Sequence, residues 1–348
     1  MTPSESFSSS ESFSNSESFS GDYQSLTAGC GFAELRDWSS VTMTGEDRHS
    51  FLHNMCTNDI RRLSAGDGCE AFCTDVKGKI VAHVFVIARE ARLDLLTVPR
   101  QAEPLITHLD RYIIREDVQL KDRSDDACWI GMSGANAREV LSTLTGGIIS
   151  ECNEPWQNMA TTVDESEFLI SRCPLFWPDS YLLCCSKREI PALIDRLENA
   201  NARRCAVSTD LCSDDAMTAL RIESGLPLLG IDFSISNLPQ EINRDELAIS
   251  FNKGCYLGQE TIARIDALGH VNQKIALVKL PENRVAGSCT ELVSNNNSVG
   301  KTTSRCWSPH HQAFLALAML RRHSNDVGCE LACAEGLATV VAPVANSC

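Results

Sequence analysis

Apolar residues recur at both helical and strand spacings from about residue 36 onward. A run rich in valine and isoleucine over residues 79–87 follows a turn at 75–78, and we predict a buried strand there. Apolar residues on one helical face predict a helix over 105–113. Two further helices are predicted, one capped by the residues 44–47 and one starting near Pro191. Because the elements lack the regular strand and helix order of a doubly wound sheet, the pattern predicts an α+β fold.

A fourth helical pattern ends on an acidic residue. It runs from Asp214 through Ile222, with Gly225 as the expected end signal, and it places Glu223 in the last turn. A carboxylate there faces the negative end of the helix, which costs about 0.3–1 kcal/mol. We therefore expect a nearby donor, either Arg221 or another arginine, or a ligand with paired N–H groups.

The two ends of the chain differ from its middle. The first residues repeat Ser-Glu-Ser-Phe, a composition too polar to fold alone, and predict a disordered tail over 1–24. The last part has short apolar runs between turns and predicts a small β-barrel domain over 274–348, with strands at 275–280, 313–320 and 337–344. The main domain is then expected over 25–273.

Composition and charge exclude some classes of binding partner and predict the cellular compartment. The 348 residues include 31 Lys and Arg against 46 Asp and Glu, and the net charge of −15 repels phosphate backbones and anionic lipids. We therefore expect no direct nucleic-acid or membrane partner. Since no apolar stretch reaches the ~18 residues of a spanning helix and no secretory leader precedes the 17 cysteines, we expect a cytoplasmic protein with reduced thiols. The lack of a C-x-x-C pair predicts that no metal is bound.

The densest chemical motif is Lys-Gly-Cys-Tyr-Leu-Gly-Gln-Glu at residues 253–260. Two glycines frame Cys255, which permits a tight turn and an accessible thiol. The ammonium of Lys253 would favour the thiolate, so Cys255 and Lys253 are the candidate catalytic pair. A cysteine packed in a turn explains the same spacing equally well. The sequence has no nucleophile-elbow, zinc-protease, P-loop or dinucleotide-binding motif, which excludes those classes.

Four blocks together resemble the YgfZ folate-binding proteins, bacterial relatives of mitochondrial iron–sulfur assembly factors. The blocks are the motif at 253–260, Thr57-Asn58-Asp59 with the turn at 77–79, Arg221 to Gly225 with 238–241, and 300–304 with 307–309. The resemblance extends to the glycine-cleavage T-protein, an aminomethyltransferase that uses tetrahydrofolate. It implies two α+β subdomains and a barrel around a central folate pocket.

The resemblance also implies roles for individual residues. Tetrahydrofolate or a related folate is the implied cofactor, and the Glu223 carboxylate would accept adjacent N–H donors of the pterin. The other implied folate contacts are Thr57, Asn58, Tyr256, Gln259 and Arg264. From the residues alone, Tyr256 can equally cover the core and Gln259 can equally bond the loop backbone. The implied partners are iron–sulfur assembly proteins or client iron–sulfur enzymes, with an indirect effect on tRNA modification.

One departure separates the chain from the transferase. Ala82 and His83 occupy the strand in which the transferase has its catalytic aspartate. Alanine cannot transfer a proton, and a histidine on an apolar strand is more often a packing residue. Three functions follow: a folate-dependent accessory protein of iron–sulfur cluster assembly or repair, an aminomethyltransferase, or a non-catalytic scaffold that engages partners through the Cys255 loop.

Overall fold

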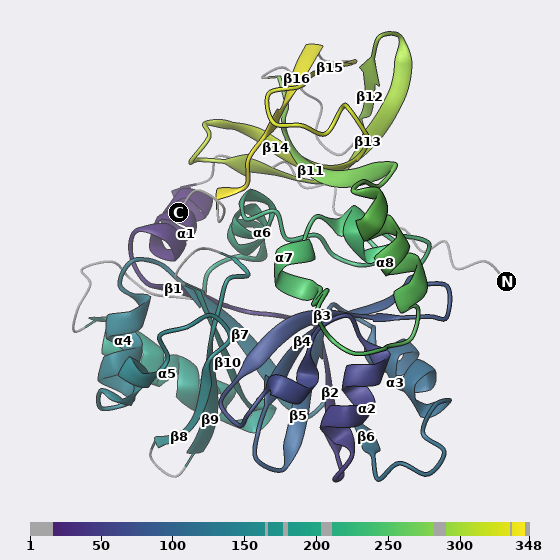
Figure 1. The fold of residues 1–348 in the computed structure, drawn as a ribbon. Coiled ribbons are helices and arrows are strands. Elements are labelled where there is room, and N and C mark those ends of the chain that lie inside the picture. Colours follow the sequence, from purple (N-terminus) through teal and green to yellow (C-terminus); the bar gives the residue numbers. More distant parts are fainter. Residues whose placement is uncertain are drawn as a thin grey trace, which may run out of the picture.

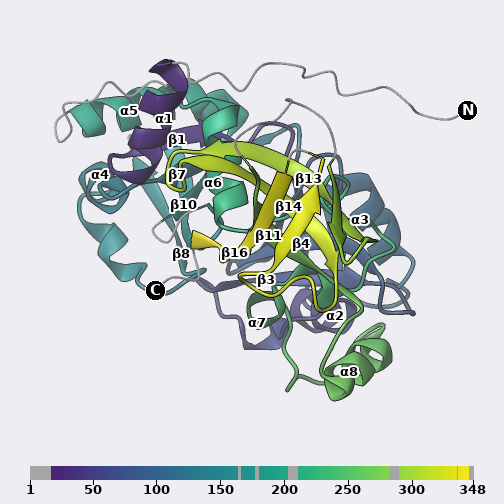
Figure 2. The ribbon, with the colours of Figure 1, turned by 90° about the horizontal axis from the view of Figure 1, so that it is seen from above.

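The computed structural model describes residues 17–163, 166–176, 180–202, 211–281, 290–334 and 336–344. Within these residues, two five-stranded antiparallel sheets and a closed six-stranded barrel surround a shared apolar centre (Figure 1, Figure 2). The predicted α+β class with a C-terminal barrel is confirmed.

The first sheet has the strand order β3-β4-β5-β2-β6 and carries α2 and α3 on one face. Strand β4 explains this layering: Ala82, Val84 and Val86 face α2 and α3, whereas His83 and Phe85 face the centre of the molecule. The elements are β2 (Ser39–Thr44), α2 (Arg48–Met55), β3 (Gly68–Thr74), β4 (Ile80–Ala88), β5 (Arg92–Thr97), α3 (Ala102–Asp110) and β6 (Gln119–Asp122).

The second sheet has the strand order β1-β7-β10-β9-β8. Helices α4 and α5 pack on one face, and α1 contacts β1 and β7. The elements are α1 (Glu17–Thr27), β1 (Gly31–Glu34), β7 (Ala127–Ser133), α4 (Ala137–Leu144), β8 (Asn158–Val163), β9 (Ser166–Cys173), β10 (Ser180–Ser186) and α5 (Ile190–Ala202).

Helix α6 (Asp214–Glu223) packs against α1 and the barrel. The buried Arg221 guanidinium lies 3.0 Å from the Asp232 carboxylate and also donates to the Ser304 hydroxyl on β13 (2.7 Å). Two short helices, α7 (Asp245–Ala248) and α8 (Gln259–Leu268), precede the barrel strands. These strands are β11 (Gln273–Lys279), β12 (Glu291–Ser294), β13 (Asn297–Ser308), β14 (Ala313–Arg321), β15 (Glu330–Cys333) and β16 (Gly336–Val341).

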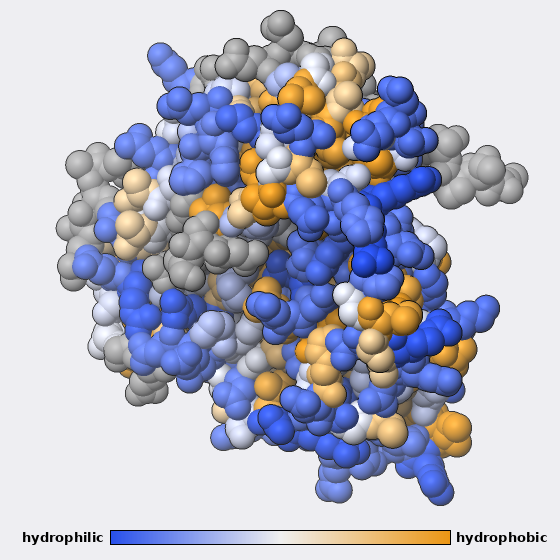
Figure 3. Space-filling view, turned by 45° about the horizontal axis from the view of Figure 1, so that its top comes forward, coloured by the Kyte–Doolittle hydropathy of each residue, from blue (hydrophilic) through white to orange (hydrophobic). Residues whose placement is uncertain are grey.

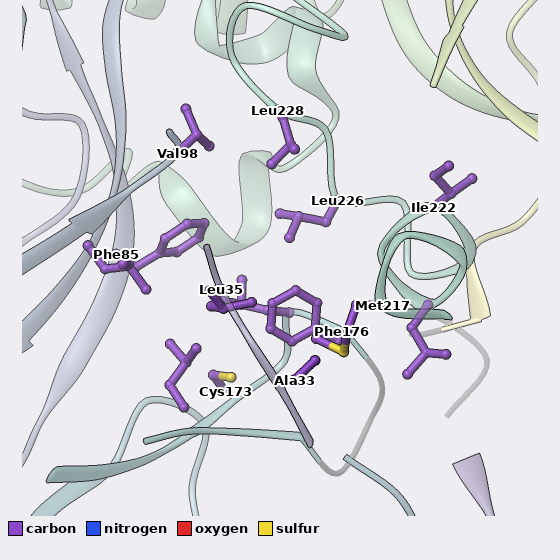
Figure 4. Close-up of a cluster of buried hydrophobic side chains, with 14 of the residues drawn as sticks. Ala33, Leu35, Phe85, Val98, Cys173, Phe176, Met217, Ile222, Leu226 and Leu228 are labelled. Carbon is purple, nitrogen blue, oxygen red and sulfur yellow. The ribbon is translucent and has the colours of Figure 1, made fainter. Parts of the chain in front are cut away.

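The central core collects apolar side chains from both sheets, α6 and the barrel. Figure 4 shows Phe85 of β4, Phe176, Met217 of α6 and Leu228 directed toward one another. The face drawn in Figure 3 is largely hydrophilic with scattered apolar groups, as the acidic composition predicts.

Most predicted elements are present, with shifted ends. The strand predicted over 79–87 is β4, and the helix predicted over 105–113 is α3, which ends at Asp110. The predicted role of Thr44 in capping α2 is wrong, because Thr44 is the last residue of β2 and Asp47 occupies the N-cap position.

The prediction of a disordered tail over 1–24 is wrong for residues 17–24, which form most of α1. Phe19, Tyr23 and Leu26 lie at i, i+4 and i+7 on one helical face and are buried in the central core. The Ser- and Glu-rich composition hides this stripe. Residues 1–16 lie outside the described part of the chain.

Candidate functional site

Lys253 anchors the loop that holds the 253–260 motif. Its buried ammonium donates to three backbone carbonyls at the end of α2, those of His53 (2.5 Å), Cys56 (2.7 Å) and Asn58 (2.8 Å). An ammonium has three N–H donors, so these bonds fill its capacity. Lys253 therefore has a structural role, and its action on the Cys255 thiol stays a prediction.

Cys255 is the thiol that this loop presents to solvent. The backbone N–H of Leu257 donates to the carbonyl of Asn54 (2.8 Å), so the loop is tied to α2 on both sides of Cys255. Gly258, with φ 81°, ends the loop against the β3–β4 turn, where an added Cβ would lie 2.4 Å from the Asp75 carbonyl oxygen. Only glycine fits this position. The predicted accessibility of the thiol is confirmed, and its reactivity stays a prediction.

Thr57 and Asn58 fasten the segment after α2 to its neighbours. The Thr57 hydroxyl donates to the carbonyl of Ala248 (2.6 Å) and accepts from the Phe72 N–H (3.0 Å). The Asn58 amide donates to the carbonyls of Glu70 (2.8 Å) and Leu247 (3.0 Å). These contacts connect the segment to β3 and α7, and the implied folate contacts of both residues stay predictions.

The other residues assigned to folate lie around the same loop. The Tyr256 ring packs with Ile249 and Ile262, and its centroid is 4.6 Å from Lys253 Nζ. Gln259 is half-buried at the start of α8, and Arg264 is exposed on that helix. Tyr256 thus covers the core, the reading that the residues alone had allowed.

Glu223 is fully buried at the end of α6, between α1 and the barrel. The Tyr23 hydroxyl donates to Oε1 and Oε2 of Glu223 (3.0 and 2.8 Å), and the Ser308 hydroxyl donates to Oε1. Burial raises the pKa of Glu223 to about 7, and the two hydroxyls act in the opposite direction. The expectation that Arg221 offsets this carboxylate is wrong, because Arg221 pairs with Asp232.

His83 belongs to a buried charged network. Its Nε2 lies 2.7 Å from Glu70 Oε1. The Arg244 guanidinium donates two hydrogen bonds to the same carboxylate, from Nε to Oε1 and from Nη2 to Oε2 (2.6 Å). Burial alone would raise the pKa of Glu70, but Arg244 and His83 together lower it to about 2. The His83 ring also stacks on Phe72, with centroids 4.6 Å apart. The predicted packing role of His83 is confirmed, and its charged partners were not predicted.

The candidate residues form two groups rather than one. Figure 1 and Figure 2 both place α6, which carries Glu223, apart from α8 and the motif loop. Apolar side chains of both sheets, α6 and the barrel fill the centre of the molecule. A cavity of about 140 Å³ borders Trp38, Phe176 and Met217. Glu223 is not among the residues lining that cavity. A larger cavity, of about 740 Å³, is lined by Trp38 and Ser39 beside the first sheet and by Trp129 of the second sheet, and Glu223 does not line it either. The folate pocket implied by the resemblance stays a prediction.

Several residues of these groups were missed in the sequence: Tyr23, His53, Asp59, Glu70, Arg244 and Ser308. His53 and Asp59 are close in sequence. Tyr23 and Ser308, in contrast, contact Glu223 from 200 and 85 residues away, and Arg244 contacts Glu70 from 174 residues away. No local spacing connects such pairs. For Tyr23 a signal did exist, the apolar stripe of α1.

The described residues also bear on metal binding and on membrane insertion. There, no group of three or more His, Cys, Asp or Glu side chains is arranged to hold a metal ion. No helix in the same residues has the length and apolar character needed to span a bilayer.

Comparison with known proteins adds to this geometry. A family model described as the GCVT N-terminal domain matches residues 1–253. The chain is 26% identical over 266 residues to the tRNA-modifying protein YgfZ of Escherichia coli, covering 76% of each chain. It is 26% identical over 320 residues to a chloroplastic protein of Arabidopsis thaliana named as a putative transferase, covering 89% of this chain and 70% of that one.

Among solved structures, the fold is similar to the glycine cleavage system aminomethyltransferase T from Bartonella henselae. The TM-score is 0.79 at 16% sequence identity, and the match covers 93% of this chain and 88% of that chain. This likeness concerns the fold.

Proposed function

Because this chain belongs to the GCVT N-terminal domain family, we propose that it is a cytoplasmic, tetrahydrofolate-binding accessory protein that serves iron–sulfur proteins. Its effect on tRNA modification is indirect, through iron–sulfur enzymes, since a net charge of −15 disfavours RNA binding. Its similarity to proteins named tRNA-modifying protein YgfZ supports this choice within the family.

The observation that carries the proposal is the loop of Cys255. Lys253 and Leu257 tie this loop to α2, and the thiol between them is exposed. Ordering a loop costs conformational entropy. Because the backbone is fixed on both sides of the exposed Cys255, the thiol is held in one position, as a thiol that reacts with a partner requires. We assign Cys255 the working role in the delivery or repair of clusters.

The aminomethyltransferase alternative receives less support. In the strand where the transferase carries its aspartate, Ala82 has no ionisable group and His83 is fully buried beside Glu70. We expect no formation of methylene-tetrahydrofolate from an aminomethylated lipoyl carrier protein. Formation of that product at an enzymatic rate would contradict the proposed accessory function and support transferase activity.

Folate binding is tested at Glu223. Its two oxygens accept hydroxyl donors here, and the same pair of acceptors suits adjacent N–H groups of a pterin once Tyr23 moves away. Glu223→Gln is expected to weaken tetrahydrofolate binding by about 1.5–3 kcal/mol, the usual contribution of a hydrogen bond to a charged group. Anaerobic calorimetric titration measures the affinity.

Glu260→Gln is the matched control, because Glu260 is exposed on α8. Equal affinity of wild type and Glu223→Gln would remove Glu223 from the folate site. No binding to either protein would remove folate from the function and leave the third reading, a scaffold that uses the Cys255 loop.

The role of Cys255 is tested in cells from which the gene is deleted. Cys255→Ser is expected to fail to restore the activity of an iron–sulfur enzyme, because a hydroxyl cannot replace a thiolate as nucleophile or cluster ligand. Cys329→Ser, at a half-buried barrel cysteine, is expected to restore it. Full restoration by Cys255→Ser at equal protein abundance would contradict the proposal.

A further inference from the structure

We propose that His53, with the Asp59 carboxylate beside its Nδ1, is the base that accepts the thiol proton of Cys255. The inference rests on the working role proposed for Cys255 and adds a Cys-His-Asp arrangement to the loop.

The backbone brings Cys255 opposite the last turn of α2. Lys253, two residues before Cys255, bonds the carbonyl of His53, and Leu257, two residues after it, bonds the carbonyl of the adjacent Asn54. The short stretch between these two contacts must therefore pass over the turn that carries His53. This leaves Cys255 no freedom to move far from that turn.

The imidazole faces this stretch. A Cβ placed on Gly254 would lie 3.8 Å from His53 Nε2, and no other atom outside the neighbouring residues would come within 4 Å. Glycine thus leaves open the space between the ring and the loop. Nε2 makes no hydrogen bond within the described part of the chain, so its lone pair stays available beside Gly254, the residue that precedes Cys255.

The other ring nitrogen lies within ion-pair distance of an acid, without a hydrogen bond between them. His53 Nδ1 lies 3.1 Å from Asp59 Oδ1, and the Asp59 Oδ2 atom lies 3.0 Å from Nε of the exposed Arg62. A carboxylate beside Nδ1 favours the tautomer with hydrogen on Nδ1 and leaves Nε2 as the acceptor. The His53 side chain is only 4% exposed, so its orientation is set by packing.

The surrounding charges keep the imidazole neutral and able to accept a proton. Burial lowers the pKa of His53, the positive charges of Lys253 and Arg61 act in the same direction, and Asp59 opposes them. The thiols of Cys56, Cys69 and Cys73, which lie around Lys253, are buried, and burial raises their pKa values. These thiols therefore stay neutral and do not compete for the proton.

The proposed step is a proton transfer. The S–H bond of Cys255 breaks, Nε2 of His53 takes the proton, and the electron pair stays on sulfur as a thiolate. Asp59 stabilises the resulting imidazolium through Nδ1–H. The step needs no oxidant or second substrate.

The test is alkylation of the full-length protein by iodoacetamide from about pH 6 to about pH 10, followed on the Cys255 peptide by mass spectrometry. His53→Gln is expected to react about tenfold more slowly at pH 7, equivalent to one pH unit along the rate profile, and to match wild type near pH 10, where the thiol ionises unaided. Asp59→Asn is expected to fall between them. His49→Gln, on the same helix one turn earlier, is expected to follow wild type.

Convergence at high pH separates a base from a structural residue. A loop loosened by the substitution would change the rate equally at every pH, which would overturn the proposal, as would identical profiles for wild type and His53→Gln. If His53→Gln does not fold, Asp59→Asn decides by the same criterion. Because alkylation needs no folate and no client protein, failure of the proposed function leaves this result readable.

Discussion

Replacing Arg244 with methionine is expected to destabilise the fold by about 3–5 kcal/mol, the cost of breaking a buried ion pair from one side. Glu70 is fully buried, and Arg244 is 6% exposed. Without the guanidinium, the Glu70 carboxylate keeps only the imidazole of His83 as a partner in its network, and burial lowers the pKa of that imidazole.

Urea unfolding at neutral pH measures this loss. Arg264→Met, at an exposed arginine on α8, is the control and is expected to stay within about 0.5 kcal/mol of wild type. The pH dependence gives a second readout. Since Arg244 and His83 lower the pKa of Glu70 from 4.5 to about 2, its contribution is present above pH 4.5 and is lost as the pH falls toward 2. A loss below about 1 kcal/mol in the variant would show that the network contributes little net stability.

Glu223→Gln is expected to change the pH dependence of stability in the opposite direction. Burial raises the pKa of Glu223 from 4.5 to about 7, so the folded state favours the protonated acid. Its contribution is fully present below about pH 4.5 and is lost as the pH rises through 7. The size is about 3 kcal/mol as an upper limit, from the shift multiplied by about 1.4 kcal/mol per pH unit.

The glutamine variant carries no titrating group at this position. Relative to wild type, it is therefore expected to gain stability as the pH rises from about 4.5 to about 8. The Tyr23 and Ser308 hydroxyls can still bond to the amide, which keeps the packing similar. Denaturant unfolding at several pH values measures the difference, with Glu260→Gln as the control. Parallel curves for wild type and Glu223→Gln would contradict an acid with a raised pKa in this position.

The sequence predicted elements whose signal is local. Strand β4, helix α6 and the barrel strands β11, β14 and β16 follow from apolar spacing with turn or cap residues, and they appear within a few residues of their predicted ends. The barrel strands β12, β13 and β15 were not predicted. Helix α1 was missed because its three buried side chains are diluted by serine and glutamate, and their burial depends on α6 and the barrel. Tertiary packing, not propensity, forms this helix.

The candidate site was predictable only in part for the same reason. The glycines around Cys255 indicated an exposed thiol correctly, because backbone freedom is a local property. The partners of Lys253 and Glu223 were not predictable, since a buried polar side chain takes whatever donors or acceptors the fold brings to it. Three backbone carbonyls at residues 53–58 and the hydroxyls of Tyr23 and Ser308 have no motif that marks them.

The hydrogen bonds of Tyr23 and Ser308 to Glu223 also limit the order in which the chain can fold during synthesis. Tyr23 is made 200 residues before Glu223, and Ser308 follows Glu223 by 85 residues. The two sheets can form while the ribosome is still making the barrel, but the carboxylate of Glu223 gains its full set of partners only after β13 has emerged. A nascent chain stopped before that point leaves the apolar side of α6 without its barrel cover. Such chains would be natural clients for chaperones that bind exposed apolar surface.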